Sequence, residues 1–157
     1  MENRIETLRT FIDELLKNKK RGNLWFVERH MYSVSTFAAM IAKKRNLNPE
    51  ISTIIGLLHD IHTLLADDSV NHAALGCLKA KEMLIELNIV SDEELEIISC
   101  AIKNHSAKAI VHDVYSELIK DADVMSHYFF NTSLSVVEGE KERLESLFHE
   151  FGLNAHS

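Results

Sequence analysis

The sequence predicts an all-α fold, because apolar residues recur at helical intervals and residues that break helices are scarce. The 157 residues include one proline and five glycines. Apolar side chains recur three or four positions apart, the spacing of one helix face, and no strand-like run of alternating β-branched residues is found. No repeat or low-complexity segment is found. A chain of this length is most simply a single compact domain, residues 1–157, with a sizeable core.

The composition argues against several classes of function. Hydrophobic residues make up 46% and charged residues 26%, as in ordinary globular proteins. No apolar run approaches the roughly 20 residues of a membrane span, and the polar start MENRIETLRT is not a secretory signal. The formal net charge of -7 argues against general nucleic-acid binding. We therefore expect a cytoplasmic protein without membrane or general nucleic-acid contacts; a homodimer stays open.

The first two helices are predicted at about residues 5–17 and 24–45. A basic cluster follows the first helix and ends at Gly22, a plausible stop. We interpret this cluster as a solvated helix end rather than a nucleic-acid contact. The second helix places His30 on a stripe of apolar residues, so this imidazole faces inward. The stripe consists of Val27, His30, Val34, Phe37 and Ile41.

The third helix leads into the most unusual stretch of the chain. Asn48-Pro49-Glu50 is a helix-start signal: an N-cap, a proline at the first position and an acid near the positive dipole end. The helix then delivers His59 and Asp60 in apolar surroundings, within the run GLLHDIH. Ionisable groups in such a place cost free energy unless they are paired or coordinate a metal. If the helix continues, His59 and His62 share one face.

Two further histidines stand at the ends of the next helices. Asp68 or Ser69 is expected to cap a helix that begins near Asn71-His72, which places His72 in the first turn. Ser91 and Glu94 fit a capping box, and the apolar face of the helix that they open ends in His105. Each histidine alone is compatible with a packing role.

The last two predicted helices differ in content. A helix from about Asp113 has an inner side that includes a carboxylate, Asp123, which is costly to bury without a partner. Asp121 is rotated from it by about 200°, so only one of the two reaches a common point; helical phase favours Asp123 modestly. Other inner residues are Leu118, Ile119, Ala122, Ser126 and Phe130. The final helix, about 138–151 with Gly152 as its stop, shows no chemical residues.

Taken together, six donors point to a metal site. They lie on or beside the buried faces of separate helices, as in metal sites inside helical bundles. Imidazole and carboxylate ligands suit Mn, Fe, Co, Ni or Zn ions, and Mg is also admitted. Six donors exceed the need of one ion, so one or two ions are expected, about 3.5–4 Å apart in the second case, with Asp60 as the bridge. The six are His30, His59, Asp60, His72, His105 and Asp123.

This ordered set resembles the HD-domain metal-dependent phosphohydrolases over residues 30–125. GLLHDIH is similar to the family's LLHDIG, and DADVMS to its DAD-x-L segment. The resemblance implies an HD-domain-like bundle of five or more helices. It also implies that the core metal ligands are His30, His59, Asp60 and Asp123, with His72 and His105 as the additional pair of dinuclear members.

The chain departs from the family pattern after the HD pair. His62-Thr63 stands where many relatives have Gly-Lys, so the lysine often placed near the phosphate is missing. No GYP-type motif follows, which argues against a cyclic-dinucleotide phosphodiesterase. His62 is either an extra ligand, a proton donor, a group that supports a ligand, or a packing residue.

We therefore predict hydrolysis of a small phosphate ester or anhydride, such as a nucleotide or a related metabolite. Metal ions would lower the pKa of a water molecule and neutralise phosphoryl oxygens, with Asp60 as the bridge and His62 as a candidate for proton transfer. Arg29 is the first candidate for a phosphate contact because it adjoins His30. Lys103 and Lys120 are the other candidates, and each of the three cations is also compatible with a surface role.

Three rival functions remain open at this stage. One is a metal-binding HD module that serves signalling or partner contact without turnover. Another is a di-iron oxygenase, since some HD relatives use a similar ligand set for O₂ chemistry. The third is a purely structural bundle, which the complete donor set disfavours because uncompensated buried histidines and acids destabilise a core.

Overall fold

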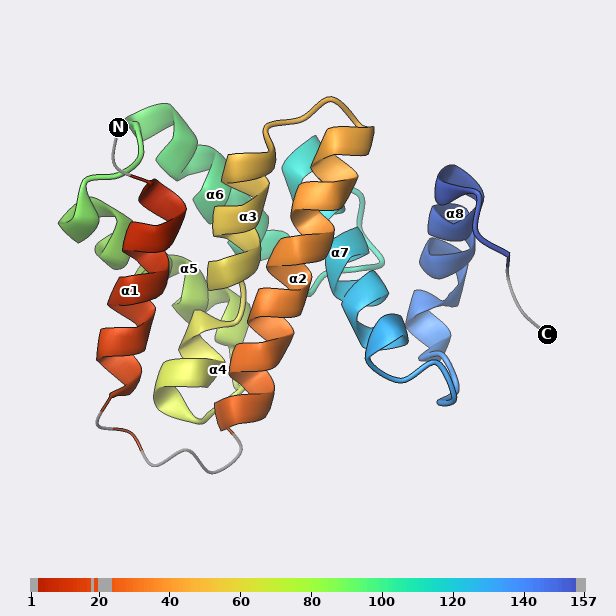
Figure 1. Ribbon diagram of the computed structural model, residues 1–157, viewed down its shortest axis with the longest axis horizontal. Coiled ribbons are helices and arrows are strands. Elements are labelled where there is room, and N and C mark those ends of the chain that lie inside the picture. Colours follow the sequence, from red (N-terminus) through yellow and green to blue (C-terminus); the bar gives the residue numbers. More distant parts are fainter. Residues whose placement is uncertain (1–2, 18, 20–23, 155–157) are drawn as a thin grey trace.

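The computed structural model describes residues 3–17, 19 and 24–154 (Figure 1). These residues form helices and connecting loops, and no strand occurs among them. The predicted all-α class is therefore confirmed. Within this part of the chain the helices are α1 (Arg4–Leu16), α2 (Leu24–Lys44), α3 (Pro49–Leu58), α4 (Ile61–Ala66), α5 (His72–Leu87), α6 (Asp92–Asn104), α7 (Val114–Phe130), the 3₁₀ helix η1 (Glu138–Glu140) and α8 (Lys141–Phe151).

The helix ends follow mostly from local capping. The Asn48 side chain accepts hydrogen bonds from the backbone N–H groups of Glu50 and Ile51, and Pro49 is the first residue of α3. Ser91 and Glu94 form the expected capping box of α6. Gly152 ends α8 in the left-handed conformation, with φ 64°, which glycine adopts without steric cost. These local predictions are confirmed.

Two local predictions need correction, and one falls outside the described residues. Neither Asp68 nor Ser69 caps α5: Asn71 precedes it in a left-handed conformation, and Asp68 accepts from the N–H of Val70 instead. Phe130 is exposed rather than inward-facing, because the last turn of α7 extends beyond the core. The expected stop at Gly22 lies outside the residues that the structure describes.

The pair α2 and α3 forms the centre of the bundle. The two helices lie side by side, with α1 on one side and α7 with α8 on the other (Figure 1). Every residue from 51 to 58 is buried. The helices meet at Gly56, where a Cβ atom would lie only 2.4 Å from the Cα atom of Ser35. Only glycine permits this approach, which brings the end of α3 close to His30.

The helical path breaks between α3 and α4. His59 is the C-cap of α3 and has helical φ and ψ angles, whereas Asp60 has φ −110° and ψ 20°. The helix does not continue through Asp60, so His59 and His62 do not share one helix face. His62 lies in the first turn of α4 and faces Gly76 of α5. A Cβ atom added to Gly76 would lie 3.8 Å from the Cβ atom of His62.

None of the helices in the described ranges is both long enough and apolar enough to span a membrane.

Candidate metal centre

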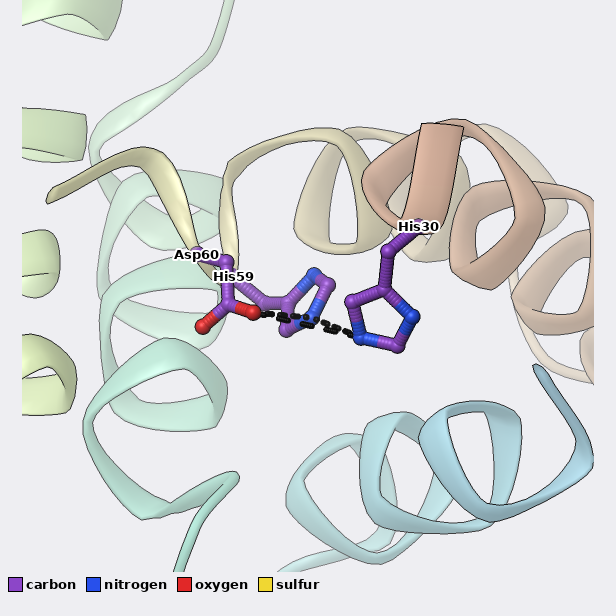
Figure 2. A group of neighbouring side chains, drawn as sticks. All are labelled: His30, His59 and Asp60. Carbon is purple, nitrogen blue, oxygen red and sulfur yellow. Dashed lines mark hydrogen bonds and ion pairs between the residues drawn. The ribbon is translucent and has the colours of Figure 1, made fainter. Parts of the chain in front are cut away.

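The six sequence-predicted donors come from five helices or helix ends and meet inside the bundle. His30 lies on α2 and Asp123 on α7; His59 and Asp60 lie at the break after α3. His72 begins α5 and His105 is the C-cap of α6. In Figure 2 the side chains of His30, His59 and Asp60 turn toward one another. Groups within ligand distance of each other are His30–His59–Asp60, Asp60–His72–His105 and His30–Asp123–His127.

Asp60 faces two pairs of imidazoles with its two oxygens. Its Oδ2 atom lies 3.9 Å from Nε2 of His30 and 3.4 Å from Nε2 of His59. Its Oδ1 atom lies 3.6 Å from Nε2 of His72 and 3.5 Å from Nε2 of His105. This division of one carboxylate between two donor pairs is the arrangement of a bridging ligand.

The four imidazoles are held with Nε2 toward the centre. Nδ1 of His59 contacts the carbonyl of Gly56 at 2.8 Å, and Nδ1 of His105 contacts that of Ile102 at 2.7 Å. Nδ1 of His72 lies 3.0 Å from the Ser69 carbonyl, and Nδ1 of His30 lies 3.3 Å from the Ser126 hydroxyl. A carbonyl accepts only, so it requires a proton on Nδ1 and leaves the Nε2 lone pair free for a cation.

Close contacts between imidazole nitrogens also indicate a cation site. Nε2 of His72 lies 3.1 Å from Nε2 of His105, and Nε2 of His59 lies 3.4 Å from Nε2 of His30. Two neutral rings that each carry the proton on Nδ1 would direct lone pairs at each other. Such a contact is favourable only with a proton or a cation between the rings. The donor set therefore fits a metal.

Asp123 adds a buried oxygen without a hydrogen-bond partner. Its Oδ1 atom is buried and unpaired among the described residues, although Nε2 of His30 lies only 2.9 Å away. This contact is close but is not aligned as a hydrogen bond. Its Oδ2 atom accepts a hydrogen bond from the ammonium of Lys108 at 2.6 Å. An orphaned buried oxygen beside an imidazole nitrogen is a further feature that fits a cation.

The structure separates Asp121 from Asp123. Asp121 accepts from the guanidinium groups of Arg45 and Arg143, each at 2.7 Å, and it does not belong to any donor group of the described residues. Asp123 faces the cluster. Helical phase favoured Asp123 only modestly; the structure distinguishes the two, because Asp121 pairs with Arg45, just after α2, and with Arg143 of α8.

Three residues beside the centre were not selected from the sequence. His127 stacks on His30, with ring centroids 4.9 Å apart, and its Nε2 lies 3.4 Å from Oδ1 of Asp123. Its Nδ1 contacts Glu140 at 3.0 Å, and Lys108 lies 3.3 Å from the same carboxylate. His127 had a signal in the sequence, because it follows Asp123 by four positions on one helix. Lys108 comes from a loop and had no such signal. Glu140 ends η1, within the predicted final helix, so the expectation that this stretch holds no chemical residue needs correction.

Charge and burial shift the pKa values of several groups in the centre. Burial opposes protonation of His59, but the Asp60 and Asp123 carboxylates prevail and raise its pKa to about 9. Burial would raise the pKa of Asp60, yet the charge of His59 and contacts with His105 hold it far below the ordinary value. Burial dominates at His105 and lowers its pKa. Burial would also raise the pKa of Asp123, but His30 and the charges of His59 and Lys108 hold it far below the ordinary value. Both carboxylates therefore stay ionised and favour positive charge between them.

The other candidate side chains occupy different surroundings. Nε2 of His62 is buried and has no hydrogen-bond partner among the residues that the structure describes. Arg29 is exposed, and its guanidinium lies 4.8 Å from the centroid of the Trp25 ring. Lys103 is exposed on α6. The interpretation of Lys120 as a phosphate contact is wrong, because its ammonium is fully buried.

Lys120 instead joins a structural network. Its ammonium donates to the Ile110 carbonyl and to Glu117 and lies beside Nδ1 of His112, all at 2.7 Å. These contacts tie α7 to the loop that precedes it. No donor of this ammonium is left for a ligand.

A helical bundle with imidazoles and carboxylates gathered at its centre defines a metal-site architecture. The HD domain family matches residues 27–127, a range that includes all six predicted donors and His127. The chain therefore belongs to the HD-domain family, most of whose members are metal-dependent hydrolases. The predicted resemblance is confirmed at this level.

One curated relative extends the comparison beyond the family match. The chain is 31% identical over 120 residues to ribonuclease Y of Chlorobium luteolum. The aligned region covers 76% of this chain but 21% of that relative, so the chain spans about a fifth of its length. No solved structure matches the chain significantly.

Proposed function

We propose that the chain is a metal-dependent phosphohydrolase that acts on a small phosphate ester or anhydride, such as a nucleotide or a related metabolite. The observation that carries this proposal is the position of Asp60, whose two oxygens face separate pairs of inward-turned Nε2 atoms at 3.4–3.9 Å. A carboxylate shared between two donor sets is the feature that hydrolases with paired ions use to clamp a phosphoryl group.

The donors divide into two sets around this carboxylate. His30, His59 and Asp123 would hold one ion together with Asp60, and His72 and His105 would hold a second one. The ligand types suit Mn, Fe, Co, Ni or Zn and admit Mg. When bound, the ions would supply the positive charge that a phosphoryl group requires and lower the pKa of the attacking water.

The protein's own groups would prepare the site for an anionic substrate. The backbone carbonyls of Gly56 and Ile102 fix the tautomer and the direction of His59 and His105, as supporting contacts of metal ligands do. Arg29 immediately precedes His30 in the sequence and is exposed; its guanidinium is the proposed phosphate contact. Local positive charge is needed because the chain as a whole carries -7.

His62 is proposed as a supporting or proton-transferring residue on the α5 side of the centre. Its buried Nε2 has no partner within the described ranges, and leaving such an atom unpaired costs free energy, which supports a function beyond packing. A homodimer and a cytoplasmic location stay predictions.

The similarity to ribonuclease Y supports a second candidate substrate, the phosphodiester bonds of RNA. The net charge of -7 disfavours it, since nucleic-acid surfaces are usually basic. The same assay can therefore include a short single-stranded RNA beside the small esters.

The test begins with protein purified without chelator and analysed for metal content. Nucleotides, sugar phosphates and the RNA are then assayed with added Mn²⁺, Fe²⁺, Co²⁺ or Mg²⁺. Phosphate release from small esters is the expected result. Bound metal without turnover of any ester would instead support a binding module, and a reaction that requires O₂ and reduced iron would support an oxygenase.

A further inference from the structure

A cavity of about 300 Å³ adjoins the candidate metal centre. It lies between α2, α7 and the segment that links α7 to α8. Where it meets the centre it is lined by His30, His127 and Glu140. Most of the remaining wall is apolar, formed by Phe26, Phe130, Leu134, Val136 and Val137. A ligand in this cavity would meet ionisable groups at one end and apolar side chains along its length.

The apolar wall is built around two aromatic rings. Phe26 and Phe130 pack edge to face, with centroids 5.4 Å apart and an interplanar angle of 80°. Both residues are nevertheless exposed, Phe26 by 47% and Phe130 by 64%. Leu134 and Val137 on the facing segment are also exposed by more than half. A contiguous exposed apolar surface around a cavity is typical of a ligand-binding site.

The size of the cavity limits what it can hold. A cavity of roughly 150 Å³ accommodates a benzene ring, so about 300 Å³ is enough for one ring with a short linker or for two fused rings. Aromatic walls favour an aromatic guest, because offset and edge-to-face contacts add to the gain from burial.

We propose that this cavity binds a flat aromatic group on the alcohol part of the substrate, while the phosphoryl group lies at His30 and Asp123. The substrate class is then a phosphate ester with one or two uncharged aromatic rings rather than a simple sugar phosphate. The position of the phosphoryl group rests on the proposed hydrolase function; the aromatic specificity rests on the cavity.

A pair of substrates that differ by one ring tests this specificity. 3-Phenylpropyl phosphate and propyl phosphate have leaving alcohols of similar acidity, so the ratio of their kcat/KM values reports binding of the ring. The expected ratio is on the order of 10. Equal kcat/KM values would overturn the proposal. Hexyl phosphate completes the series: if it is turned over as well as the phenyl ester, the cavity accepts a flexible chain and the aromatic assignment fails.

A pair of variants tests the wall itself. Phe130→Ala should reduce the preference for the phenyl ester by roughly 3- to 10-fold. Ile85→Ala is the matched control, because Ile85 is also 64% exposed but lies on α5 outside the cavity, and it should keep the ratio of the unmodified protein. Circular dichroism verifies the fold of both variants. An unchanged ratio in Phe130→Ala would contradict the proposal.

Binding without turnover separates this inference from the proposed function. The single tryptophan, Trp25, packs with its ring centroid 6.2 Å from that of Phe26, so its fluorescence should respond to a ligand at this wall. 4-Phenylbutylphosphonate, which cannot be hydrolysed, should bind at least several-fold more tightly than butylphosphonate, with Mn²⁺ present.

The outcomes of the two assays are distinct. Ring-dependent binding without hydrolysis of any ester would support the cavity's specificity and count against the hydrolase function. Hydrolysis without a ring preference, or equal binding of the two phosphonates, would overturn the aromatic specificity and leave the hydrolase proposal standing.

Discussion

The direction of three imidazoles is set by contacts within a few residues of each ring. His59, His72 and His105 each place Nδ1 against the carbonyl of the residue three positions earlier. His59 and His105 are the C-caps of α3 and α6, whereas His72 is the first residue of α5. In each case the contact with the carbonyl holds the ring so that Nε2 faces the centre.

Removal of the Asp60 carboxylate should have the largest effect of any single substitution in the centre. Asp60→Ala is expected to lower metal affinity by more than roughly 100-fold and to abolish turnover, because both donor sets lose a shared ligand. Metal analysis after dialysis and an ester hydrolysis assay measure this. Asp68→Ala, which alters an exposed loop carboxylate, is the control. Full metal content and activity in Asp60→Ala would contradict the assignment of the bridge.

A substitution of His72 should separate the two proposed ions. His72→Ala removes one donor of the set that contains His105 but leaves His30, His59 and Asp123 intact. We expect about one ion fewer per chain, with the helical content unchanged. Metal stoichiometry by elemental analysis and far-UV circular dichroism provide the measurement. Equal loss of both ions would show that the two sets do not bind separately.

At the scale of the helices, the contact between α2 and α3 places His30 beside His59. The close approach at Gly56 leaves no space for a side chain, because the nearest atoms belong to the backbone of Ser35. Further along, the break at Asp60 lets that carboxylate leave the helix axis and face both donor pairs. Packing and backbone shape thus act together on one pair of adjacent residues.

Gly56→Ala should test this helix contact. The added Cβ would lie 2.4 Å from a Cα atom, so the two helices must separate, at a cost of about 1–3 kcal/mol in the free energy of unfolding. Gly139→Ala is the control, because a Cβ there meets nothing within 4 Å. Urea denaturation of both variants gives the difference. If the two variants are equally stable, the contact does not hold the helices at this distance.

At the scale of the whole molecule, ion pairs join helices that are remote in the sequence. Asp121 connects α7 to Arg45, just after α2, and to Arg143 of α8. Arg4 of α1 pairs with Glu94 of α6 at 2.8 Å and with Glu50 of α3 at 2.8 Å. These partly buried pairs add orientation between helices whose packing is otherwise apolar.

The pair of Arg4 and Glu94 predicts a dependence of stability on pH. The hydrogen bond from Arg4 holds the pKa of Glu94 below its ordinary value. The folded state therefore binds fewer protons than the unfolded state, so this contribution is fully present above the ordinary pKa of glutamate and is lost as the pH falls through the lowered value. Glu94→Gln keeps a side chain that can form the capping box. It should lower the free energy of unfolding by about 0.5–1 kcal/mol at pH 7.

The comparison of the two proteins across pH completes this test. The difference in unfolding free energy between the unmodified chain and Glu94→Gln should shrink as the solution becomes more acidic than the ordinary glutamate pKa. Urea titrations at a series of pH values measure it. A difference that is constant down to acidic pH would show that the carboxylate charge contributes nothing.

Helical periodicity and caps within four residues were enough to predict the all-α class, most helix starts and the six candidate donors on or beside buried helix faces. They could not predict which aspartate faces the centre, what the buried Lys120 ammonium contacts, or that Lys108 and Glu140 adjoin the site. The reason is physical: the partners of these groups, such as Arg45 and Arg143 for Asp121, come from helices far away in the chain, and a local pattern carries no information about which distant side chains meet.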